Sequence, residues 1–131
     1  MLERLSFKDL LLIAEATLGV PYDRLEETVC VFRAESALAA PFARLRGADL
    51  HPDPVERATL CATRLIRSQP FLFGNREVGY ECMREMLVLE GCRWLRQDEE
   101  AKHVEATLNR LEVGTVTAAE FLRWARERVT A

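Results

Sequence analysis

Helix start and stop signals recur along this chain, with apolar residues at helical spacing between them, and this pattern most constrains its fold. Two pairs of residues have the spacing of a capping box: Ser6 with Asp9, and Thr117 with Glu120. Asp53 followed by Pro54 is a third helix start, because proline suits the first helical position. The strong signals are all helical and the connections are short. The sequence therefore predicts an all-α, compact bundle of six to seven helices.

The signals place the expected elements along the chain. Helices are predicted over 7–18, 33–40, 53–68, 75–90, 98–113 and 117–129. The second helical region begins somewhere after Asp23, and its start is ambiguous because Thr28 to Phe32 is rich in β-branched and aromatic residues. We expect a loop or flap over Pro41–Pro52 and a short extended link over Cys92–Arg96.

Composition limits the class of protein. A chain of 131 residues with 49% hydrophobic residues fits one domain, which we place at 1–131. The longest apolar run, Leu10–Ala14, is far short of a membrane span, and no basic stretch precedes a long apolar one near the start. These features predict no membrane association and a cytoplasmic location. A net charge of −3 gives no overall attraction to nucleic acid, so we expect no nucleic-acid partner.

The cysteines and histidines do not predict a metal or redox site. The cysteines form no C-x-x-C pair and have apolar neighbours, which favours four small core residues: Cys30, Cys61, Cys82 and Cys92. His51 and His103 are far apart and have no partner at ligand spacing. We therefore expect no side-chain metal site and no cofactor.

One stretch carries recognisable chemistry, the loop and helix start over Gln69–Gly79, with the sequence QPFLFGNREVG. Phe71 is expected to point into the core, and Gly74 to allow a backbone conformation that other residues resist. The next helix begins near Asn75, where free backbone N–H groups favour an anion. If the stretch is only a connection, Phe73 also packs in the core and Asn75 caps the helix.

This stretch resembles the active-site loop of Fic and Doc proteins, the Fido family, which has the form H-P-F-x-D-G-N-K-R-x-G between two helices. The residues kept in register are Pro70, Phe71, Gly74, Asn75 and Gly79. Glu35–Ala43 resembles a segment common in Doc-like (death-on-curing) members, L-E-S-A-L-A-x-P, and Gly47–Pro52 resembles the G-x-x-L-Y-P turn that follows it. The resemblance covers roughly residues 5 to 129. It implies a Fido-like helical bundle and a toxin–antitoxin ancestry in a prokaryote.

The departures from the family pattern fall on the positions that do its chemistry. In the family the loop histidine deprotonates a protein hydroxyl, and the acid binds magnesium on a nucleotide. Gln69 stands at the histidine position, and an amide cannot act as a general base near neutral pH. Phe73 stands at the acid position and offers no oxygen to magnesium.

The phosphate-binding positions of the resemblance are partly kept. Gly74, Asn75 and Arg76 are the candidates for binding an anion or phosphate, since Arg76 keeps the charge of the family's lysine. Glu77 replaces the family's arginine and reverses the charge there. Weak phosphate or nucleotide binding stays open, without a metal.

We therefore expect a catalytically degenerate Doc-like domain, a pseudoenzyme that acts through contacts with a protein partner, either an antitoxin-like helix or a target peptide. The alternative is a Fido-type nucleotidyl or phosphoryl transferase with altered chemistry that modifies a protein hydroxyl. A third reading, an unrelated helical interaction domain, makes Trp94 and Trp124 candidate interface anchors, although such tryptophans are more often core residues. His51 is a candidate to replace the missing base, and Arg64 and Arg67 to add charge near an anion. The sequence does not fix the oligomeric state.

Overall fold

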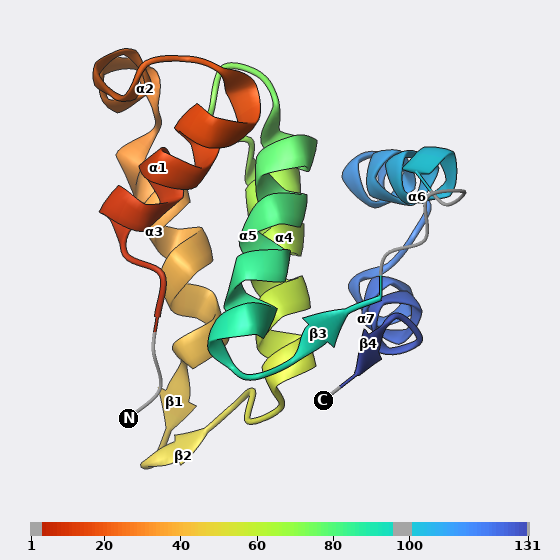
Figure 1. Ribbon diagram of the computed structural model, residues 1–131. Helices are drawn as coiled ribbons and strands as arrows, with labels where there is room; N and C mark the ends of the chain where they lie inside the picture. The colour runs from red at the N-terminus through yellow and green to blue at the C-terminus, as the bar shows by residue number, and fades with distance from the viewer. Residues whose placement is uncertain (1–3, 96–100, 131) are drawn as a thin grey trace.

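Two long antiparallel helices, α4 (Pro54–Ser68) and α5 (Asn75–Leu89), run through the centre of the computed structural model (Figure 1). The structure describes residues 4–95 and 101–130. Around the central pair lie α1 and α3 on one side and α6 and α7 on the other. The remaining elements are α1 (Phe7–Leu18), α2 (Tyr22–Thr28), α3 (Val31–Ala39), the 3-10 helix η1 (Ala40–Phe42), β1 (Arg44–Leu45), β2 (Ala48–Asp49), β3 (Arg93–Trp94), α6 (Ala101–Val113), α7 (Ala118–Arg126) and β4 (Val129–Thr130). The described residues thus form a seven-helix, all-α bundle, as predicted.

The central pair packs closely because α5 carries a glycine where it crosses α4. A Cβ atom added at Gly79 would lie 2.8 Å from Cγ1 of Ile66 and 3.3 Å from the carbonyl oxygen of Ala62. Any larger residue would have to push the two helices apart. Gly79 is one of the residues kept in register with the family loop, and in this molecule it has a packing role.

The helix starts that the sequence predicts are confirmed where the structure describes them. Both capping boxes form, at Ser6 with Asp9 and at Thr117 with Glu120. The side chain of Asp53 accepts a hydrogen bond from the backbone N–H of Glu56 at the start of α4. The expected start of α6 at Asp98, Glu99 and Glu100 lies outside the described residues, as does Arg96 of the expected extended link.

Some predicted boundaries are wrong. The second helical region is two helices, α2 and α3, because Val29 and Cys30 are extended within the β-branched and aromatic stretch. The loop over Pro41–Pro52 contains η1 and the hairpin β1–β2. The last helix ends at Arg126, since Val129 and Thr130 instead pair as a strand with Arg93 and Trp94.

The buried residues form one hydrophobic cluster that draws on every α-helix in the described residues. Cys61 and Cys82 are buried in it, and burial raises the pKa of the Cys61 thiol to about 12, so these two thiols are core residues as predicted. Cys92 is half-buried, but Cys30 is exposed because it is the N-cap residue of α3 at the surface. The prediction that all four cysteines are core residues is therefore wrong for Cys30.

Trp94 and Trp124 are half-buried, with ring centroids 5.4 Å apart, and Trp124 stacks on the buried ring of Phe121. They pack against the core rather than standing out as exposed anchors. In the described residues, none of the helices has both the length and the apolar character needed to cross a membrane.

Candidate functional site

The loop that joins α4 to α5 occupies one end of the bundle, together with the end of α1 (Figure 1). Gln69 ends α4 in the left-handed region, at φ 52°, where its N–H still bonds the carbonyl of Leu65. Gly74 is the N-cap of α5 at φ 77°, and a Cβ atom there would overlap the side chain of Leu18. Both the backbone angle and the contact with α1 therefore favour glycine at this position.

Asn75 holds the loop in shape through two buried hydrogen bonds to Phe71. Its Oδ1 accepts from the backbone N–H of Phe71, and its Nδ2 donates to the carbonyl of Phe71, both at 2.9 Å. Asn75 is 6% exposed and the Phe71 side chain 5%. Phe71 thus points into the core as predicted, whereas Asn75 is the first residue of α5 and not its cap. Both polar ends of the Asn75 amide are engaged within the protein.

The sequence-predicted site residues all line one groove, of about 460 Å³, between this loop and the ends of α1 and α6. They are Gln69, Phe73, Gly74, Asn75, Arg76 and Glu77. Glu112 of α6 forms part of the opposite wall and accepts a hydrogen bond from Nε2 of Gln69 at 3.0 Å. Arg76 donates to Oδ1 of Asn109, also on α6, at 3.1 Å.

The charge of this groove is unfavourable for a polyphosphate. Arg76 is the one cationic residue in its lining, and Glu77 and Glu112 are two carboxylates, all within the described part of the chain. Each carboxylate near a bound phosphate would repel it. Among the described residues there is also no group of three or more His, Cys, Asp or Glu side chains placed to hold a metal ion.

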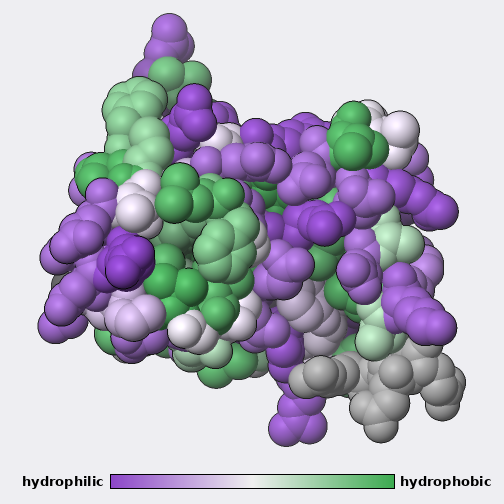
Figure 2. Space-filling view, turned by 90° about the horizontal axis from the view of Figure 1, so that it is seen from above, coloured by the Kyte–Doolittle hydropathy of each residue, from purple (hydrophilic) through white to green (hydrophobic). Residues whose placement is uncertain are grey.

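The outer face of the loop is apolar and exposed. Leu72 is 76% exposed and Phe73 59%, so Phe73 is not the core residue that a mere connection would need. Val31 and Phe32 at the start of α3 are exposed at the same end, because the N–H of Cys30 bonds the carbonyl of Pro70 at 2.8 Å. We call Val31, Phe32, Leu72 and Phe73 the end patch. Figure 2 looks down on this end and shows apolar side chains gathered there within a hydrophilic surround.

Sequence reasoning missed three of the four end-patch residues: Val31, Phe32 and Leu72. The signal was present in the run Phe71-Leu72-Phe73, because three consecutive bulky apolar residues in a short loop cannot all face the core. The contribution of α3 depends on the contact of Cys30 with Pro70, forty residues along the chain, and no local pattern indicates it.

The other residues that the sequence analysis placed near this loop as a possible base or added positive charge lie elsewhere or are engaged in other contacts. His51 precedes α4 and Gln69 follows it, so a helix of 15 residues, about 22 Å long, separates them. Arg67 donates to the carbonyls of Leu111 and Val116 and so fastens the end of α6, while Arg64 is exposed on α4. His51 therefore cannot act as a base at this loop.

Comparison of the chain with protein-family models, with curated proteins and with solved structures found no match. The family resemblance therefore rests on the residues quoted for it.

Proposed function

We propose that this chain is a catalytically degenerate, Doc-like member of the Fic/Doc family that acts through contacts with a protein partner at the α4–α5 loop. The proposal includes a cytoplasmic location and descent from the toxin of a toxin–antitoxin pair. It rests on the register of Pro70, Phe71, Gly74, Asn75 and Gly79 with the family loop, and on the residues that replace its working positions.

The contacts of the loop support a loss of the family's chemistry. The amide of Gln69 donates a hydrogen bond to Glu112, and an amide at this position cannot accept a hydroxyl proton near neutral pH. Phe73 places a phenyl ring where magnesium would need an oxygen ligand. Both polar atoms of the Asn75 amide are hydrogen-bonded to the backbone of Phe71. Glu77 lines the same groove as Arg76 and opposes its charge there. Positioned positive charge is the main catalytic device in phosphoryl transfer, and in this groove Arg76 is set against the two carboxylates of Glu77 and Glu112.

The observation that carries the proposal is the exposure of Phe73. A phenylalanine in place of the family's acid would by itself favour burial, yet Phe73 is 59% exposed, beside Leu72, which is 76% exposed. Contiguous exposed apolar side chains with a polar surround mark surfaces that other molecules cover. Aromatic residues at the centre of such surfaces supply much of the binding energy in protein interfaces.

The first experiment tests the chemistry. The purified chain is incubated with labelled nucleoside triphosphates, magnesium and host proteins, next to a Gln69→His, Phe73→Asp variant. We expect no transfer of label by the natural chain. Transfer by the natural chain would contradict the proposal and support the altered transferase, with a protein hydroxyl as its substrate.

The second experiment tests the contact. The chain is purified from its host with any bound protein, and the same is done for Phe73→Ser and for the control Val88→Ser, an equally exposed position on α5. We expect a stoichiometric partner that Phe73→Ser loses and Val88→Ser keeps. A partner retained by Phe73→Ser, or lost equally by both variants, would exclude the end patch as the contact.

A further inference from the structure

A second cavity lies between α4 and α7 and has a volume of about 200 Å³. Its apolar lining comes mainly from Leu60 of α4 and from Ala118, Ala119 and Leu122 of α7. The two alanines leave room that larger residues would fill. Because a cavity of about 150 Å³ holds a benzene ring, this one can take a single ring with a small substituent.

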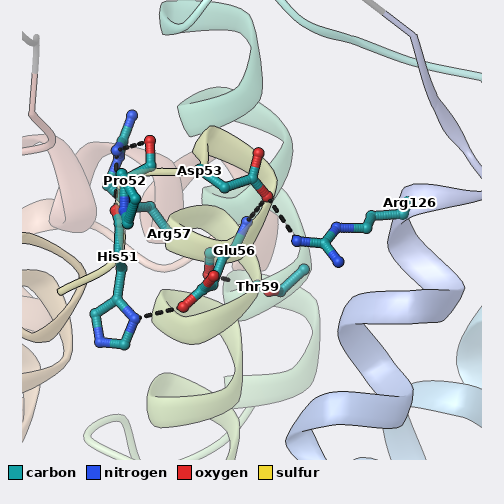
Figure 3. Close-up of polar contacts among 7 residues, drawn as sticks. All are labelled: His51, Pro52, Asp53, Glu56, Arg57, Thr59 and Arg126. Carbon is teal, nitrogen blue, oxygen red and sulfur yellow. Dashed lines mark hydrogen bonds and ion pairs between the residues drawn. The ribbon is translucent and has the colours of Figure 1, made fainter.

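His51 and Glu56 form the polar end of this cavity (Figure 3). Nδ1 of His51 lies 2.6 Å from Oε1 of Glu56. Because a carboxylate only accepts, Nδ1 carries the hydrogen, and in the neutral imidazole Nε2 is then an acceptor. Figure 3 shows Nε2 turned away from Glu56. Within the described residues, neither Nε2 of His51 nor Oε2 of Glu56 has a hydrogen-bond partner.

The other polar side chains of the lining add acceptors and no donors. The hydroxyl of Thr59 donates to the carbonyl of Glu56, and that of Thr63 donates to the carbonyl of Thr59. Because each hydroxyl already donates its one hydrogen to a backbone carbonyl of α4, it can only accept a hydrogen bond from a ligand. The side chains around this cavity therefore combine a carboxylate, an imidazole nitrogen and two hydroxyl oxygens, all acceptors, with an apolar floor.

The polar end is also held in place before any ligand arrives. Arg57 is 4% exposed, and its guanidinium donates to the carbonyls of His51 and Pro52 at 3.0 and 2.7 Å. The same guanidinium makes a bidentate pair with Glu90 at the end of α5. The backbone that carries His51 is thereby fixed to the core, so a ligand that binds here pays little entropy for ordering this segment.

We propose that this cavity binds a small organic ammonium ion, with its N–H groups on Glu56 and His51 and its apolar body against Leu60 and Leu122. An ammonium group brings three donors and one positive charge to a rim that offers acceptors and one unpaired carboxylate oxygen. A carboxylate ligand would meet Glu56 with like charge. This site is independent of the α4–α5 loop and of the function proposed for it.

The probe is benzylamine, titrated into the full chain at about pH 8, where an ordinary imidazole is neutral. Binding is followed by the ring signals of the two histidines in ¹H–¹³C correlation spectra. The chain has only two histidines, and His103 lies on α6, where it accepts a hydrogen bond from Trp124. We expect a saturable shift of the His51 signals at millimolar ligand, with the His103 signals unchanged.

Variants and related ligands test whether benzylamine binds in this cavity and whether its ammonium group is recognised. Leu122→Trp fills the cavity and should abolish the shift, whereas Leu12→Trp, at an exposed position on α1, should leave it. Glu56→Gln should weaken binding about tenfold or more, since a hydrogen bond to a charged group is lost. Benzyl alcohol should bind more weakly and benzoate not at all. No saturable His51 shift, equal binding of benzoate, or binding that survives Leu122→Trp would each overturn the proposal.

Discussion

Replacing Asn75 by alanine should destabilise the whole protein, because this side chain bonds both backbone groups of Phe71. The change leaves the Phe71 N–H and carbonyl without partners, and the Asn75 side chain that shields them is 6% exposed. A buried backbone group that loses its hydrogen bond costs about 1–3 kcal/mol. The two groups together predict a loss of about 2–6 kcal/mol, a large part of the roughly 5–15 kcal/mol that stabilises a typical domain.

The assay is urea denaturation followed by far-UV circular dichroism, with the free energy of unfolding extrapolated to water. Asn109→Ala is the matched control. Asn109 is the chain's other asparagine, it is exposed on α6, and its side chain makes one exposed hydrogen bond, which it accepts from Arg76. We expect that control to stay within about 0.5 kcal/mol of the natural protein. If Asn75→Ala is as mild as the control, then Asn75 does not hold the loop and its amide is available to a ligand.

Three further perturbations test the packing and the electrostatics. Arg57→Ala leaves the carboxylate of Glu90 buried without its partner and should lower the unfolding free energy by about 3–5 kcal/mol in urea denaturation. Changing both residues to leucine should recover only the part that comes from the unpaired carboxylate, because the carbonyls of His51 and Pro52 still lack their donor. Gly79→Ala should cost about 1–3 kcal/mol in a thermal melt, since its Cβ would press on α4. Burial raises the pKa of Cys61 from 9.0 to about 12, so the unfolded thiol ionises first. The contribution of Cys61 to stability should then be constant below about pH 9 and fall by about 1.4 kcal/mol per unit as pH rises toward 12. Burial also raises the pKa of the Cys82 thiol, so Cys61→Ala should reduce the slope between about pH 8 and about pH 10 in urea denaturation without abolishing it.

The helix starts could be predicted because capping is local chemistry. A capping box needs two residues three positions apart, and both boxes in the sequence form in the structure. The bundle class follows, since helices with one apolar face and short connections have few ways to bury that face. The break between α2 and α3 could not be predicted, and the sequence indicated only that the start of this helical region was ambiguous. The extended residues Val29 and Cys30 lie in a stretch that suits a strand as well as a helix.

Non-local pairing explains the wrong ends of elements. Val129 follows Ala125 at helical spacing, and nothing near it in the sequence indicates that it pairs with Trp94. The strands β3 and β4 have two residues each, so they carry no alternation that a pattern can detect. Their pairing comes from the way α5 and α7 bring the two segments together.

The candidate site was predicted as far as it is contiguous in the chain. The residues from Gln69 to Glu77 line one groove because a tight loop and the first turn of a helix must lie together. Their partners Asn109 and Glu112 come from α6, and only the fold brings them there. Burial of Arg57 was likewise not predictable, because an arginine on a polar helix position is usually solvated.

Calorimetric titration of magnesium–ATP into the purified chain shows whether the groove at the α4–α5 loop binds a metal–nucleotide complex. We expect no magnesium-dependent heat for the natural chain, because Phe73 offers the metal no oxygen and Glu77 and Glu112 face the groove. A variant with Gln69→His, Phe73→Asp and Glu77→Arg, which places the groups of the Fic/Doc loop at these three positions, serves as the comparison. Tight, magnesium-dependent binding of ATP by the natural chain would show that this loop does hold a metal–nucleotide complex and that the proposed loss of chemistry is wrong.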